Sequence, residues 1–137
     1  MSQIPTDMKA FNAKLIAEFR AHKGRLSGQM AGRQLLLLTT RGAKTGADRT
    51  VVVGYRPYNG ELAIIASNNG APQPPAWFHN LQKDPEATVE VGPDKFKVHT
   101  RVAGPDERPK AAKVIEYLEQ QQAQTGREIP IVILERA

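Results

Sequence analysis

The first apolar pattern along the chain has helical spacing. Phe11, Leu15 and Phe19 recur every four residues, which places them on one face of a helix. We therefore predict an amphipathic helix over residues 7–23 and, after it, a loop rich in glycine and serine over residues 24–32. A helix of a small domain normally buries such a face against the rest of the fold.

After residue 33 the apolar positions follow the shorter pattern of strands. Six segments are apolar or rich in β-branched residues and are bounded by turn residues. The Asn59-Gly60 pair between two of them is typical of a tight hairpin. Pro75 and Pro105 each precede a segment that predicts a helix. The expected strands cover residues 35–38, 50–56, 62–66, 89–91, 96–102 and 129–134, and the expected helices residues 76–83 and 105–124.

This order of elements excludes a doubly wound parallel sheet, which needs a helix after nearly every strand. A small antiparallel barrel fits better, because closure removes exposed sheet edges. We predict a mainly β (α+β) fold in which a six-stranded antiparallel barrel carries three helices on its outside: the N-terminal helix, the short helix and the helix of the C-terminal half. Residues 1–32 supply the first helix and loop, and residues 33–137 the barrel, within one domain overall.

Composition agrees with one small domain and removes several kinds of chemistry. The 137 residues include no cysteine, which excludes disulfides, thiolate metal ligands and a cysteine nucleophile. The histidines His22, His79 and His99 lack the spacing of a metal site. No apolar run is long enough to span a membrane, and the N-terminus lacks the apolar core of a signal peptide. We therefore expect a cytoplasmic protein without a metal.

Charge is spread unevenly along the chain. The net charge is +5, but residues 1–56 carry +7 and residues 57–137 carry −2. Such asymmetry indicates an anionic partner or a solvated basic face. The candidate partners are nucleic acid, an anionic membrane surface, and a phosphorylated or polycarboxylate small molecule. Aromatic residues make up only 6% and do not alternate with the basic ones, which argues against nucleic acid.

One turn concentrates groups that bind anions. Residues 42–46 read Gly-Ala-Lys-Thr-Gly, but in a Walker motif the Lys-Thr pair would follow the second glycine. A turn bounded by glycines exposes backbone N–H groups, and Arg41, Lys44, Thr45 and Arg49 add donors around it. The turn is therefore either an anion site or an exposed basic hairpin.

Two further segments carry polar or aromatic groups without a decisive motif. The sequence Ser67-Asn68-Asn69-Gly70 lacks the elbow of acyl-transferring enzymes. It does offer small polar groups and free amides at the end of a strand, where they can hold the carbonyls of a flat ligand. Trp77 lies on the short expected helix, and a lone tryptophan more often packs in a core than stacks on a base.

Four blocks in this order and spacing resemble the deazaflavin-dependent nitroreductase family, split-barrel oxidoreductases of mycobacteria and their relatives. Residues 39–49 match the family's Thr-Thr-x-Gly-x-Lys-Ser/Thr-Gly-x-x-Arg. Residues 66–70 read Ala-Ser-Asn-Asn-Gly, residues 75–81 read Pro-Ala-Trp-Phe-His-Asn-Leu, and residues 125–130 read Thr-Gly-Arg-Glu-Ile-Pro. No single block is decisive, whereas the four together are specific.

The resemblance implies a split β-barrel that binds the deazaflavin coenzyme F-420, which carries a phosphate and a polyglutamate tail. Many members have arginine where this chain has Ala43, and Arg41 is the candidate to replace it. The positively charged N-terminal half suits such an anion. By matching position, Lys44, Thr45, Gly46 and Arg49 hold the phosphate, Ala66, Ser67 and Asn68 lie against the ring, and Trp77 and Asn80 line the same pocket.

The implied activity is hydride transfer from the reduced coenzyme to an electron-poor acceptor: a quinone, an enone or conjugated lactone, or a nitroarene. Tyr55, Ser67, His79 or solvent can supply the accompanying proton. Some members of the family carry tyrosines that close over the substrate, and here Tyr117 is the aromatic residue beside the glutamine-rich stretch 118–124.

Other classes of protein remain open from the sequence. Split barrels host several cofactors, so an FMN- or haem-binding relative is one alternative. A non-catalytic coenzyme carrier is another. A third is a protein at the membrane surface that makes peripheral contact through the helix at residues 7–23. The sequence allows a monomer or a homodimer.

Overall fold

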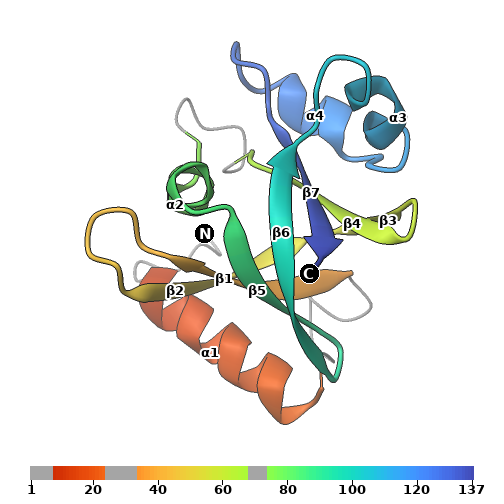
Figure 1. Cartoon of the computed structure of the whole chain (residues 1–137). Helices are drawn as coiled ribbons and strands as arrows, with labels where there is room; N and C mark the ends of the chain where they lie inside the picture. Colours follow the sequence, from red (N-terminus) through yellow and green to blue (C-terminus); the bar gives the residue numbers. More distant parts are fainter. Residues whose placement is uncertain (1–7, 24–33, 68–73) are drawn as a thin grey trace, which may run out of the picture.

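The computed structural model describes residues 8–23, 34–67 and 74–137, with side chains described from residue 13 onward. The start of the first helix, with its candidate caps Thr6 and Asp7, lies outside these residues. The elements follow one another as α1 (Met8–Ala21), β1 (Leu35–Arg41), β2 (Asp48–Gly54), β3 (Arg56–Tyr58), β4 (Glu61–Ile65), α2 (Ala76–Lys83), β5 (Glu86–Val91), β6 (Asp94–Val102), α3 (Arg108–Ala112), α4 (Leu118–Gln122) and β7 (Ile131–Arg136) (Figure 1).

The strands form one antiparallel sheet in the order β2-β1-β5-β6-β7-β4-β3. Its two edge strands, β2 and β3, are joined through Tyr55 alone. A single residue cannot span a flat sheet of this width, so the sheet curls until its edges meet at one corner. The backbone N–H of Tyr55 donates to the carbonyl of Gln34 at 3.1 Å and fixes that corner. The predicted antiparallel split barrel with helices outside is confirmed.

The barrel has seven strands rather than the predicted six. The expected strand over residues 50–56 is wrong because the chain bends at Tyr55. The residues before the bend pair with β1, from Gly54 opposite Leu35, and those after it pair with β4, from Arg56 opposite Ala63. A continuous β-branched run does not reveal that its two ends belong to opposite edges of the sheet.

The predicted single helix over residues 105–124 is also wrong. Two short helices, α3 and α4, replace it, and between them Val114 and Ile115 donate backbone hydrogen bonds three residues back, at 3.2 Å. β-Branched residues are poor helix formers, and the bend keeps Ile115 and Leu118 both buried, at 1% and 5% exposure. The short helix over residues 76–83 is confirmed as α2.

Strand β7 separates two apolar cores. Val132 and Leu134 pack with α2 and the inner strands, whereas Ile131 and Ile133 pack with α3 and α4. Because successive side chains point to opposite faces, a strand buried on both sides must be apolar throughout. Figure 1 shows α3 and α4 together beside β7, at the far end of the molecule from α1.

The N-terminal helix packs on the sheet. α1 contacts β2, and its Phe19 is only 1% exposed. The Arg20 guanidinium donates to both carboxylate oxygens of Glu90 on β5, at 3.0 and 2.8 Å. Part of the apolar stripe is therefore used within the fold. No helix in the described part of the chain is long and apolar enough to cross a membrane.

Candidate functional site

The turn between β1 and β2 is closed by its own backbone. Gly42 N–H donates to the Ala47 carbonyl at 2.7 Å, and Gly46 N–H donates to the Gly42 carbonyl at 2.8 Å. Gly46 has φ +73°, a conformation that glycine adopts without strain. The Thr45 hydroxyl accepts from Ala47 N–H at 3.2 Å. The consecutive amides of Lys44 and Thr45 donate to no atom of the described residues, and paired free amides of this kind form an anion-binding nest.

Helix α2 holds this turn from behind. The Asn80 side-chain oxygen accepts from Ala43 N–H at 2.9 Å, and its amide donates to the Thr40 hydroxyl at 3.0 Å. The Lys83 ammonium donates to the Ala43 carbonyl at 2.8 Å. Asn80 is buried, so its polar atoms orient the turn. The turn is thus positioned before any ligand arrives.

A cavity of about 580 Å³ opens between the turn, β2 and α2. Lys44 and Arg49 are exposed on its rim, and neither forms an ion pair with a described residue. Two unpaired cations and two free amides at one cavity are suited to a phosphate group. The cavity is lined by Gly42, Ala43, Lys44, Thr45, Arg49, Val51, Ala76, Trp77, His79 and Asn80.

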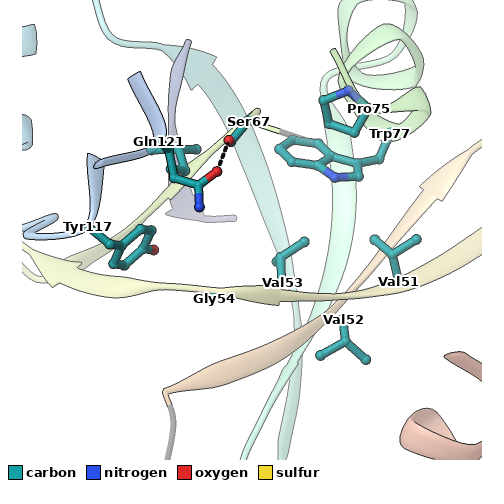
Figure 2. A pocket seen from close by; sticks show the side chains of 10 residues that line it. Val51, Val52, Val53, Gly54, Ser67, Pro75, Trp77, Tyr117 and Gln121 are labelled. Carbon is teal, nitrogen blue, oxygen red and sulfur yellow. Dashed lines mark hydrogen bonds between the residues drawn. The ribbon is translucent and has the colours of Figure 1, made fainter. Parts of the chain in front are cut away.

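A second cavity of about 370 Å³ neighbours the first, and Val51 and Trp77 line both. The Trp77 ring projects from one side, and Val51 and Val53 project from β2 on the other (Figure 2). Apolar groups on both sides of a space suit a flat aromatic ligand. The remaining lining residues are Val52, Gly54, Ile65, Ser67, Pro75, Tyr117 and Gln121.

The end of β4 borders this second cavity. The Ser67 hydroxyl donates to the Gln121 side-chain oxygen at 2.5 Å (Figure 2). The Arg127 guanidinium donates to the carbonyls of Ala66 and Ser67, at 3.1 and 2.7 Å. Sequence reasoning missed the positions of Arg127 and Gln121, although Arg127 lies in one of the four matched blocks. Asn68 lies outside the described residues.

Tyr117 brings an unpaired hydroxyl to the same cavity. Its oxygen is buried and has no hydrogen-bond partner in the described structure. The hydroxyl lies near Gly54, where a Cβ would come within 3.5 Å of it. Burial raises the pKa of Tyr117, while the nearby Arg56 charge acts in the opposite direction. The phenol is therefore protonated at neutral pH and available as a donor.

Several predicted residues lie elsewhere. Ala66 is fully buried in the core, and Tyr55 forms the corner between β2 and β3; neither lines the two cavities. The exposed Arg41 lines a separate groove that it shares with Asp48 and Glu86. His79 is exposed on α2 and lines the first cavity. No group of side chains in the described ranges could hold a metal ion.

A curled antiparallel sheet, with a cationic turn and two neighbouring cavities beside it, defines a split-barrel protein. The chain belongs to the F420H(2)-dependent quinone reductase family, whose model matches residues 13–136. The cofactor of this family is coenzyme F-420. The free amides, the exposed cations and the neighbouring cavity lined by Trp77 and the valines of β2 fit such a group.

Relatives and solved structures agree with this membership. An F420H(2)-dependent quinone reductase of Mycobacterium tuberculosis is 33% identical over 129 residues, which cover 88% of this chain and 86% of the relative. A solved F420-H2 dependent reductase (FDR-A) is 31% identical, with a TM-score of 0.68 over 75% of this chain and 95% of the other. A solved domain-swapped dimer is 29% identical, with a TM-score of 0.68 over 96% of this chain and all of the other.

Proposed function

We propose that this protein reduces quinone-type acceptors with hydride from reduced coenzyme F-420, using the first cavity for the coenzyme's phosphate and the second for its ring and the acceptor. The observation that carries the proposal is that the two cavities are neighbours, with Val51 and Trp77 lining both. A cavity beside the cationic turn thus adjoins a cavity that Trp77 and the valines of β2 line. Enones and nitroarenes are further acceptors of the same electronic class.

The phosphate site is proposed to consist of the Lys44 and Thr45 amides, the Gly46 turn and the side chains of Lys44 and Arg49. Charge-assisted bonds of this kind are about twice as strong as neutral ones. Asn80 contributes by holding the turn rather than by touching the coenzyme. Arg41, which faces another groove, contributes long-range attraction for the polyanionic tail.

The ring is proposed to lie between Trp77 and the valines of β2. Ser67 forms the polar border of this site. Arg127 fixes that border because it binds the Ala66 and Ser67 carbonyls together. The protein thus supplies shape and orientation, and the bound coenzyme supplies the hydride.

Reduction of a quinone to a hydroquinone requires a proton as well as the hydride. Of the candidate donors, Tyr117 is best supported, because the residue lines the second cavity and its buried hydroxyl has no partner in the described structure. The Ser67 hydroxyl is engaged with Gln121, His79 lines the first cavity and Tyr55 lines neither. We assign Tyr117 to bind the acceptor oxygen and pass it a proton that solvent replaces.

Assembly and membrane contact are separate questions. The domain-swapped relative makes a homodimer the arrangement to test against a monomer, by sedimentation of the purified protein. Peripheral membrane contact through α1 draws little support, because Phe19 is already buried. Binding to anionic vesicles that weakens with salt would argue for it.

The central test is a fluorescence titration of Trp77, the only tryptophan in the chain, with coenzyme F-420 and in parallel with FMN. Saturable quenching by F-420 alone, followed by oxidation of the reduced coenzyme on addition of a soluble quinone, is the expected result. Tight binding of FMN would favour the flavin alternative. Binding of F-420 without turnover on any acceptor would favour a coenzyme carrier.

A further inference from the structure

Each nitrogen of the Arg56 guanidinium donates a hydrogen bond. Its Nε and Nη2 donate to the Glu116 carboxylate at 2.6–3.0 Å, and its Nη1 donates to the Tyr55 carbonyl at 2.8 Å. The side chain is 22% exposed. Arg56 therefore links the corner where the sheet edges meet to the segment between α3 and α4, and its plane is fixed before any ligand binds.

This fixed cation lies over the ring of Tyr117, 4.7 Å from the ring centroid. The pair is anchored at the cationic end, whereas the phenol hydroxyl at the other end has no described partner. A buried hydroxyl without a partner costs free energy, so a fold that retains one needs a reason. The second cavity offers that reason, because Tyr117 and Gly54 both line it and Figure 2 shows the hydroxyl pointing toward its interior.

We propose that Arg56, braced by Glu116, is a positioning residue that holds the Tyr117 hydroxyl toward the acceptor oxygen in the second cavity and strengthens it as a hydrogen-bond donor. The inference rests on the proposed function for the identity of the acceptor. The ion pair and the stacked ring, however, are observed in the structure independently of that proposal. Arg56 itself touches neither the coenzyme nor the acceptor.

Two physical effects support this role. A cation over an aromatic face is attracted by the ring quadrupole, which limits how the ring can turn. The same charge lowers the pKa of Tyr117, against the larger effect of burial and that of Glu116. Those are the charged groups that act on Tyr117 among the described residues. Arg56 therefore makes the phenol a better donor without ionising it at neutral pH.

The test compares Arg56→Gln, Arg56→Lys and Glu116→Gln, each alone and with Tyr117→Phe. Arg136→Gln is the matched control, because Arg136 lies 4.1 Å from the centroid of Phe96, a ring without a hydroxyl. We expect Arg56→Gln to lower kcat/KM for a soluble quinone about 3- to 10-fold, with Lys restoring part of the loss. In the Tyr117→Phe background the same change should have little further effect.

A readout besides activity separates the outcomes. Carbon-13 labelling of the tyrosine ring carbon that bears the hydroxyl follows the ionisation of Tyr117 by NMR, without coenzyme. Arg56→Gln should raise the Tyr117 pKa, while the quenching of Trp77 fluorescence by F-420 stays unchanged. If Arg56→Gln does not fold, Glu116→Gln, which removes the group that braces Arg56, takes its place in the test. An unchanged pKa, or equal losses in both Tyr117 backgrounds, would overturn the proposal. Failure of the wild-type protein to bind F-420 would instead refute the proposed function.

Discussion

The two neighbouring cavities, one at the turn and one at the proposed acceptor site, are built in opposite ways. At the turn end, the candidate phosphate-binding groups come from one short segment, Gly42 to Arg49, and α2 holds that segment through Asn80. At the acceptor end, Ser67 and Gln121 are 54 residues apart in sequence, and Tyr117 comes from the bend between α3 and α4. The residues of the turn end are close together in the sequence, whereas those of the acceptor end are brought together only by folding.

The ends also differ in what they leave unsatisfied. The turn satisfies its internal hydrogen bonds and leaves two amides of Lys44 and Thr45 for a ligand. The acceptor end leaves the buried Tyr117 hydroxyl without a described partner. A prearranged anion site mainly supplies affinity, whereas a donor aimed at the reacting group mainly affects turnover. Changes at the turn end should therefore move the dissociation constant, and changes at the acceptor end should move kcat.

The largest expected effect belongs to Arg49. Arg49→Ala removes a charge-assisted contact and should weaken F-420 binding by about 1.5–3 kcal/mol, seen as a higher dissociation constant in the Trp77 titration. Arg41→Ala is the matched control, because Arg41 carries the same charge but lines another groove. Its smaller effect should fade with added salt. Equal losses in both variants would mean that the turn attracts the coenzyme only by net charge.

Asn80→Ala comes next and acts through the fold. The substitution leaves Ala43 N–H and the Thr40 hydroxyl without partners in a buried place, which should lower the free energy of unfolding by about 1–3 kcal/mol, measured by urea denaturation. F-420 binding should weaken with it because the turn loses its support. Lys83→Ala, which removes only an exposed bond to the Ala43 carbonyl, should cost less. A stable Asn80→Ala protein with normal affinity would show that the turn holds itself.

The same contrast explains which features of the structure could be predicted from the sequence. The turn could be predicted because Gly42, Lys44 and Arg49 are close along the chain, and backbone geometry alone brings their groups together. Helix α2 could be predicted because Pro75 stands near its start and Pro85 beyond its end. These are local signals, and they are confirmed where the structure tests them, in the position of the turn and of α2.

The errors have the opposite character. The strand expected over residues 50–56 bends at Tyr55, and the helix expected over residues 105–124 breaks before Leu118. Both changes depend on contacts with residues far away in the sequence, which a local pattern does not indicate. The same holds for Arg127, whose bonds to the Ala66 and Ser67 carbonyls cross the fold. The contacts of Tyr117 likewise depend on the closed sheet and could not be predicted from the sequence.

At the acceptor end, Ser67→Ala should have a moderate effect. Loss of the hydroxyl that donates to Gln121 should lower kcat/KM for a quinone about 3- to 10-fold, because Gln121 can then turn away from the cavity. The dissociation constant of F-420 should stay close to the wild-type value. Gln121→Ala removes the same bond from the other side and should match it. A rise in the dissociation constant with unchanged kcat would assign Ser67 to affinity and erase the distinction between the two ends.

The smallest expected effect lies away from both ends, where α1 docks on β5. Arg20 lowers the pKa of Glu90 through its hydrogen bonds and charge, so this pair stabilises the fold above the unfolded pKa of glutamate and ceases to do so as the pH falls through the lower folded value. Glu90→Gln should cost about 0.2–1 kcal/mol at neutral pH, since Arg20 is half exposed and water screens the pair. The difference between wild type and variant should vanish in strong acid, as followed by urea denaturation, while F-420 affinity and kcat stay unchanged. A change in either would mean that the N-terminal helix takes part in the site, and that the molecule has a third functional region rather than two.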